Sequence, residues 1–165
     1  MLMSTMILNF HRTSNNISTS LDFNRFRMEA LSILTSNVEQ LSMYYFDEAS
    51  TDTTSAKRIE DFVQPNWLGE DQNDDGAIDD IDDLHGVTLS DTGLSGVPYN
   101  VDFALDYVSL VSDSIAHSEV RQYHKRVKIS VSDSYDPPLI YQIVNDEPQR
   151  DTLRMEVVVS YWFFN

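Results

Sequence analysis

The sequence predicts an α+β fold in which a long N-terminal amphipathic helix packs on an antiparallel β-sheet of about four strands. Residues 1–46 contain no Pro and no Gly, whereas the other 119 residues hold all five of each. After residue 100 the apolar residues alternate with polar ones, which is typical of strands that have one packed face. We therefore divide the chain into an N-terminal helix, 1–46, and a globular head, 47–165. In the head, an acidic loop at 47–100 precedes a β-meander at 101–165.

The helical pattern is strongest over residues 21–46, where apolar residues recur mostly at steps of three and four. These residues are Leu21, Met28, Leu31, Leu34, Val38, Leu41 and Tyr45. The preceding segment 13–20 (TSNNISTS) is a poor helix former, because short polar side chains compete for backbone hydrogen bonds. It either separates two shorter helices or lies inside one continuous helix.

Four stretches have the strand pattern: 101–111, 123–131, 139–144 and 153–164. In the first, Val101, Phe103, Leu105 and Tyr107 share one face. In the second, one face holds Tyr123, Lys125, Val127, Ile129 and Val131. Turn residues separate the later stretches. We expect the amphipathic helix to cover the packed face.

The charge of the chain is strongly negative. Its 27 Asp and Glu against 11 Lys and Arg give a formal charge of −16 at pH 7. Such a surface repels phosphate backbones, so no nucleic-acid partner is expected. The absence of cysteine excludes disulfides, thiolate zinc ligands and a thiol nucleophile. No run of 18 or more apolar residues is present, so a membrane-spanning helix is not expected from these residues.

The acidic stretch 71–82 (DQNDDGAIDDID) matches the spacing of a calcium-binding loop. Gly76 falls where such a loop turns sharply, and Ile78 at its apolar anchor. The predicted Ca²⁺ ligands, in order, are Asp71, Asn73, Asp75, the backbone carbonyl of Ala77, Asp79 and Asp82. Asp at the twelfth position resembles the dockerin type of loop. We expect the ion to be structural, because it would neutralise carboxylates that otherwise repel one another. An acidic, solvated turn is the alternative.

Motifs of catalysis are not found. The four histidines, His11, His85, His117 and His124, lack metal-ligand spacing, and no G-x-S-x-G or S-x-x-K motif occurs. We therefore do not expect an enzyme.

Three segments resemble type IV pilins and the pseudopilins of type II secretion. Residues 26–41 (FRMEALSILTSNVEQL) look like the end of a pilin-type N-terminal helix. Residues 79–86 (DDIDDLHG) closely resemble the DDVDDYNG segment of minor-pilin-like proteins of the mannose-sensitive haemagglutinin pilus type. Residues 123–131 (YHKRVKISV) are similar to the strand that follows it. In that family about twenty apolar residues with Glu at position five begin the chain; here Met1–Phe10 corresponds to part of that stretch, and position five is Thr5.

The resemblance implies a structural subunit of an extracellular, cell-surface filament that polymerises with itself or with other pilins. The apolar residues expected in the filament core are Met1, Leu2, Met3, Met6, Ile7, Leu8 and Phe10. Two alternatives remain open. One is a periplasmic pseudopilin in a secretion machine, and the other is a monomeric, calcium-stabilised adhesin or binding domain.

Overall fold

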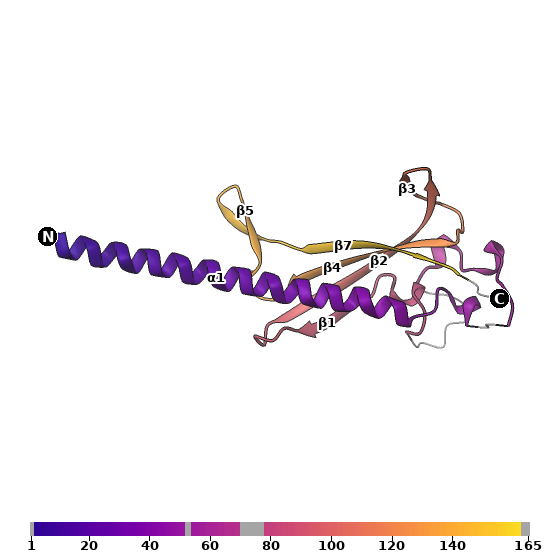
Figure 1. Ribbon diagram of the computed structural model, residues 1–165, viewed down its shortest axis with the longest axis horizontal. Helices are drawn as coiled ribbons and strands as arrows, with labels where there is room; N and C mark the ends of the chain where they lie inside the picture. Colours follow the sequence, from indigo (N-terminus) through magenta and orange to yellow (C-terminus); the bar gives the residue numbers. More distant parts are fainter. Residues whose placement is uncertain (1, 52–53, 70–77, 163–165) are drawn as a thin grey trace.

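A computed structural model describes the backbone of residues 2–51, 54–69 and 78–162, together with the side chains of those residues from position 20 onward (Figure 1). Its one α-helix, α1, spans Leu2–Gln40. A 3₁₀ turn, η1 (Leu41–Met43), follows directly. The polar segment 13–20 therefore lies inside one continuous helix. Within the described part of the chain, no helix combines the length and apolar character needed to cross a membrane.

Short 3₁₀ turns connect α1 to the sheet. They are η2 (Glu48–Ser50), η3 (Ile59–Asp61), η4 (Pro65–Trp67) and η5 (Asp82–Leu84). All of them lie near the C-terminal end of α1 (Figure 1). Tyr45 ties this region together, because its N–H donates to the Asp79 carbonyl (3.2 Å) and its carbonyl accepts from the Ile81 N–H (2.9 Å).

Seven strands follow: β1 (Thr88–Thr92), β2 (Pro98–Val111), β3 (Ser114–His117), β4 (His124–Asp133), β5 (Tyr141–Val144), β6 (Glu147–Arg150) and β7 (Leu153–Ser160). Four of them form the order β1-β2-β4-β7, and β3 pairs with the end of β2 to complete a five-stranded sheet. The β5–β6 hairpin forms a separate sheet of two strands. Each of these strand pairs is antiparallel. Ile129 in β4 is the central position, opposite Phe103 of β2 and Met155 of β7.

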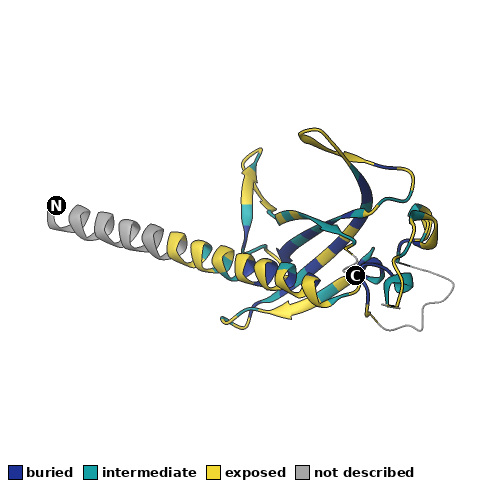
Figure 2. Ribbon diagram, turned by 45° about the vertical axis from the view of Figure 1, so that its right-hand side comes forward, coloured by how far each residue is buried: buried dark blue, intermediate teal, exposed yellow. Residues whose placement is uncertain are grey.

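The core lies between the C-terminal half of α1 and one face of the sheet (Figure 2). Along β2, Val101, Phe103, Leu105 and Tyr107 are buried, as the alternation predicted. Along β4, the buried residues of the predicted face are Lys125, Val127, Ile129 and Val131, whereas Tyr123 just before the strand is partly exposed. Helix α1 contributes Ala30, Ile33 and Leu34. Each large apolar side chain that is fully buried stabilises the fold by about 1.5–3 kcal/mol.

The predicted fold class, a long amphipathic helix on about four strands, is wrong in both parts and is corrected here. The main sheet has five strands, with a second sheet beside it. The helix packs over a short length: its buried side chains lie between Ala30 and Asn37 among the residues from position 20 onward. Leu21, Met28 and Leu31, expected on the packed stripe, are exposed. The physical reason is that another face of α1 packs on the core. That face holds Phe23, Phe26, Ala30, Ile33, Leu34 and Val38, so Leu21, Met28 and Leu31 lie beside it.

The strands that sequence reasoning missed are short and polar. β1 and the first residues of β2 lie within 88–100, which was expected to be loop. β3 and β6 are exposed along their whole length, so they show no alternation of apolar and polar residues. The expected strand at 139–144 forms only as β5, in the separate hairpin and not in the main sheet.

Candidate functional site

The most distinctive chemical feature of the head is a lysine with no solvent exposure. Lys125 lies on the inward face of β4, where the neighbouring inward positions are apolar. Its ammonium donates to Asp82 Oδ1 (2.7 Å), to the Phe46 carbonyl (2.8 Å) and to Asp47 Oδ2 (3.0 Å). All three N–H groups therefore have an acceptor, which is what a buried ammonium requires.

Aromatic rings enclose the same ammonium. Nζ lies 4.5 Å from the centre of the Phe46 ring and 5.3 Å from that of Tyr107, so both rings are within range of a cation–π interaction. Phe46 in turn packs edge-to-face on Phe62, which contacts Tyr161 in the same way. These rings exclude water from the ion pairs, and exclusion of water strengthens the electrostatic attraction.

Asp47 joins three segments of the chain. It is the N-cap residue of η2, where its Oδ1 accepts the Ala49 N–H (3.2 Å). Its Oδ2 accepts both the Lys125 ammonium and the Val63 N–H (2.9 Å). One buried carboxylate thus fixes the turn after α1, the loop before η4 and strand β4 relative to each other.

Asp80 and Asp82 anchor the C-terminal end of the acidic stretch. Asp80 Oδ1 accepts the backbone N–H groups of Asp82 (2.9 Å) and Asp83 (3.2 Å), which starts η5. Asp82 then directs its own carboxylate inward to Lys125. Residues 79–83 (DDIDD) therefore lead into η5, and the Asp82 carboxylate joins this turn to Lys125 in the core.

Three carboxyl groups, Asp47, Asp80 and Asp82, share this region with one ammonium. Burial, together with the negative charge of Asp82, raises the pKa of Asp80 to about 8. Burial also raises the pKa of Asp82, while the Lys125 ammonium opposes that rise. The region therefore carries an excess of buried acid, which favours the protonated form of Asp80.

The predicted calcium ligands are only partly within the described residues. Asp71, Asn73, Asp75 and Ala77 lie outside them. Asp79 is exposed, and its backbone carbonyl accepts from Tyr45. Asp82 is buried against Lys125, so its carboxylate is engaged on the side away from solvent. The two described residues of the predicted ligand set therefore differ: Asp79 is exposed, whereas the Asp82 carboxylate is already paired with Lys125. Among the described residues, no group of three or more His, Asp or Glu side chains is arranged to hold a metal ion.

His85, next to the acidic stretch, has a structural partner. Its Nδ1 accepts the N–H of Leu105 in β2 at 2.9 Å. Gly69 adopts a positive φ of 86° beside the backbone of His85, and a Cβ at this glycine would lie 2.5 Å from the His85 carbonyl oxygen. The loop before the acidic stretch thus packs tightly on the turn that follows it.

The side chains predicted to form a filament core, Met1, Leu2, Met3, Met6, Ile7, Leu8 and Phe10, lie outside the described side chains. The sequence reasoning also overlooked Lys125 as a site residue. The signal was present, since the alternation placed Lys125 on the same face as Val127 and Ile129. A lysine is almost never fully buried unless it is paired, so that position implied buried acidic partners.

Comparisons with known proteins leave the chain without an assigned relative. No protein-family model matches it, and searches of curated proteins and of solved structures likewise find no match.

Proposed function

We propose that this chain is a structural subunit of an extracellular, type IV pilus-like filament, assembled from copies of itself or with other pilins. The observation that carries the proposal is the position of α1. The helix has 39 residues, which corresponds to roughly 60 Å. Only its C-terminal half runs along the sheet, and its N-terminal half extends beyond the head (Figure 1).

The sequence of that extension supports a role in assembly. Seven of the first ten residues are apolar, from Met1 to Phe10. Apolar residues on a helix that projects from a domain mark an interaction surface. When the same helix of another copy covers them by a head-to-tail contact that does not close, the assembly grows as a helical filament.

The acidic segment supports a second part of the proposal, a structural Ca²⁺ ion. Asp71, Asn73, Asp75, the Ala77 carbonyl and Asp79 would hold the ion through oxygen ligands, and Asp82 would fasten the end of the segment through Lys125. A bound calcium ion neutralises clustered carboxylates. This chain would provide the oxygen ligands and a fixed C-terminal end for the segment.

Assembly is tested in the cells that make the protein, with Leu8→Asp and Phe10→Asp combined. We expect the double variant to be absent from filaments while its head unfolds at the parent's temperature, because charges in the helical core oppose its packing. Immuno-electron microscopy of sheared filaments and thermal unfolding of the purified chain measure the two effects. Leu94→Asp is the matched control, since Leu94 is fully exposed at the β1–β2 turn and should not affect assembly.

Filaments that contain the double variant would contradict this role of α1. Two other results would favour the alternatives. Parent chains found only in the periplasm, with secretion lost in the double variant, would indicate a pseudopilin. A parent chain that remains a monomer at the cell surface would indicate a calcium-stabilised binding domain.

A further inference from the structure

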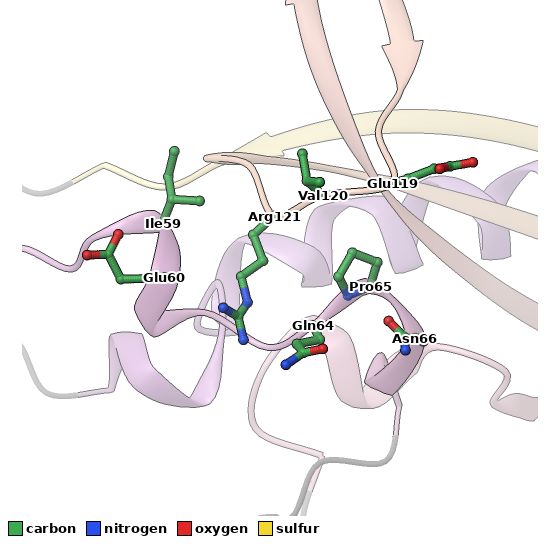
Figure 3. Close-up of a pocket in the computed structure, with 8 residues that line it drawn as sticks. All are labelled: Ile59, Glu60, Gln64, Pro65, Asn66, Glu119, Val120 and Arg121. Atoms are coloured by element: carbon green, nitrogen blue, oxygen red, sulfur yellow. The ribbon is translucent and has the colours of Figure 1, made fainter.

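A hollow of about 540 Å³ opens on the head between η3, η4 and the connection from β3 to β4 (Figure 3). Its size falls within the range of small-molecule sites. Arg121 extends from the β3–β4 connection toward the 64–66 turn, and Gln64 lines the same hollow (Figure 3). The hollow is separate from the buried lysine site and from α1.

The guanidinium of Arg121 is incompletely paired. Its Nε–H is buried and has no hydrogen-bond partner. Within the described residues, Arg121 forms no ion pair, although the chain is rich in acid. A buried N–H without an acceptor is costly, so the protein alone leaves this guanidinium incompletely paired. The planar fork of a guanidinium is complementary to a carboxylate.

The remaining lining favours hydroxyl groups over a bare anion. The amides of Gln64 and Asn66 both donate and accept hydrogen bonds, while ionised Glu60 and Glu119 only accept them. Glu60 is paired with Arg58 (3.1 Å), which offsets its charge. A simple anion would be repelled by the formal charge of −16 without such compensating contacts.

The site also has an apolar side and firm support. Pro65 and Val120 line it, and they offer a surface for the C–H face of a sugar ring. The turn that carries Arg121 is fixed by Ser118, whose hydroxyl donates to the Val120 carbonyl (2.8 Å) and accepts from the Gln122 amide (3.3 Å). On the other side, the Tyr107 hydroxyl donates to the Val63 carbonyl (2.9 Å) just before η4.

We infer that this hollow binds a sugar acid of the hexuronate class, with its carboxylate on Arg121, its hydroxyls on Gln64 and Asn66, and its ring on Pro65 and Val120. The site is independent of the proposed filament role. It would give the head a means to recognise a single hexuronate unit.

The test uses the ¹H–¹⁵N resonance of Arg121 Nε in the ¹⁵N-labelled full chain, titrated with D-glucuronate, D-glucose and acetate. We expect glucuronate to shift this resonance and to bind at least ten times more tightly than glucose or acetate. Arg121→Gln should reduce glucuronate affinity at least tenfold, as measured by calorimetry. Arg154→Gln is the matched control, because Arg154 lines a different groove between α1 and β7.

Gln64→Ala provides a second variant in which Arg121 is retained, and we expect it to weaken glucuronate more than acetate. Thermal unfolding verifies that each variant is folded. Failure of the parent to bind glucuronate would overturn the inference, as would equal binding by Arg121→Gln. Acetate that binds as tightly as glucuronate would exclude the sugar contacts, and glucose that does so would exclude the carboxylate contact.

Discussion

Lys125 shows how one inward-facing charge organises the loops at one end of a sheet. It contacts Asp47 just after α1 and Asp82 at the end of the acidic stretch, which are 35 positions apart in the sequence. Both contacts are withdrawn from water. The Asp47 carboxylate also accepts the Val63 N–H, and the backbone N–H of Asp82 donates to the Asp80 carboxylate. Removing the ammonium would leave two buried carboxylates without their partner.

We therefore expect Lys125→Met to lower the free energy of unfolding by about 3–5 kcal/mol, the usual cost of breaking a buried ion pair on one side. Urea denaturation measures the change. Lys128→Met is the matched control on the same strand. Its ammonium is partly exposed and pairs with Asp106 at 3.2 Å, so about 1 kcal/mol or less should be lost. Equal losses in both variants would contradict the anchoring role of Lys125.

Asp106 lies on the outward face of β2, opposite the face that packs on the core. Its pKa allows a test of how stability depends on pH. Burial alone would raise its pKa, but hydrogen bonds from Arg126, His117 and Lys128 outweigh that effect and lower the pKa to about 2. The ordinary value is 3.8. A carboxyl whose pKa is lowered by folding stabilises the native state above its ordinary pKa, and this stabilisation is lost as the pH falls toward the folded value.

Accordingly, Asp106→Asn should be less stable than the parent at pH 7, and the difference should shrink as the pH falls from about 4 to 2. Thermal unfolding across this range measures it. Asp102→Asn is the control, since Asp102 lies on the same strand and contacts the Thr88 hydroxyl instead of a cation. If the difference in stability between the parent and Asp106→Asn stayed constant down to pH 2, it would contradict the lowered pKa of Asp106.

At the scale of elements, strand prediction succeeded where one face of a strand is buried. β2 and β4 alternate because their inward side chains meet α1 and the outward ones meet solvent. β3 and β6 lack that signal, since both of their faces are exposed and their formation depends on pairing with a neighbouring strand. Hairpins of this kind are specified by turn geometry and partner strands more than by hydrophobic patterning.

The acidic segment is the element on which the calcium proposal is tested. Calcium at about 100 times its dissociation constant should stabilise the chain by about 2.7 kcal/mol, which corresponds to about 5–10 °C in unfolding temperature. Asp71→Ala or Asp75→Ala should abolish this increase and its sensitivity to EDTA. Differential scanning calorimetry with and without calcium measures the effect.

Asp113→Ala is the control for that experiment, because Asp113 is an exposed acid in the turn between β2 and β3. It should retain the calcium response. An unfolding temperature of the parent that is identical in calcium and in EDTA would contradict the calcium proposal while leaving the role of Lys125 intact.

At the scale of the whole molecule, the head and the free half of α1 have different physical requirements. The head buries its apolar residues within itself, around Ile129 and Tyr107. The extended half of the helix lies beyond the sheet (Figure 1). In the proposed filament, the N-terminal half of α1 packs on the helices of other copies, as its C-terminal half packs on the sheet.

Local patterning in the sequence was enough to predict a helix before residue 40, the inward faces of β2 and β4, and Lys125 among apolar neighbours. These features follow from periodicity, which is a property of residues close together in the chain. The tertiary structure decided the length over which α1 packs, the fifth strand, the second sheet and the partners of Lys125. It also brought Arg121 to the loop at 59–66. Each of these depends on segments that are distant in sequence and meet only when the chain folds, so no local pattern specifies them.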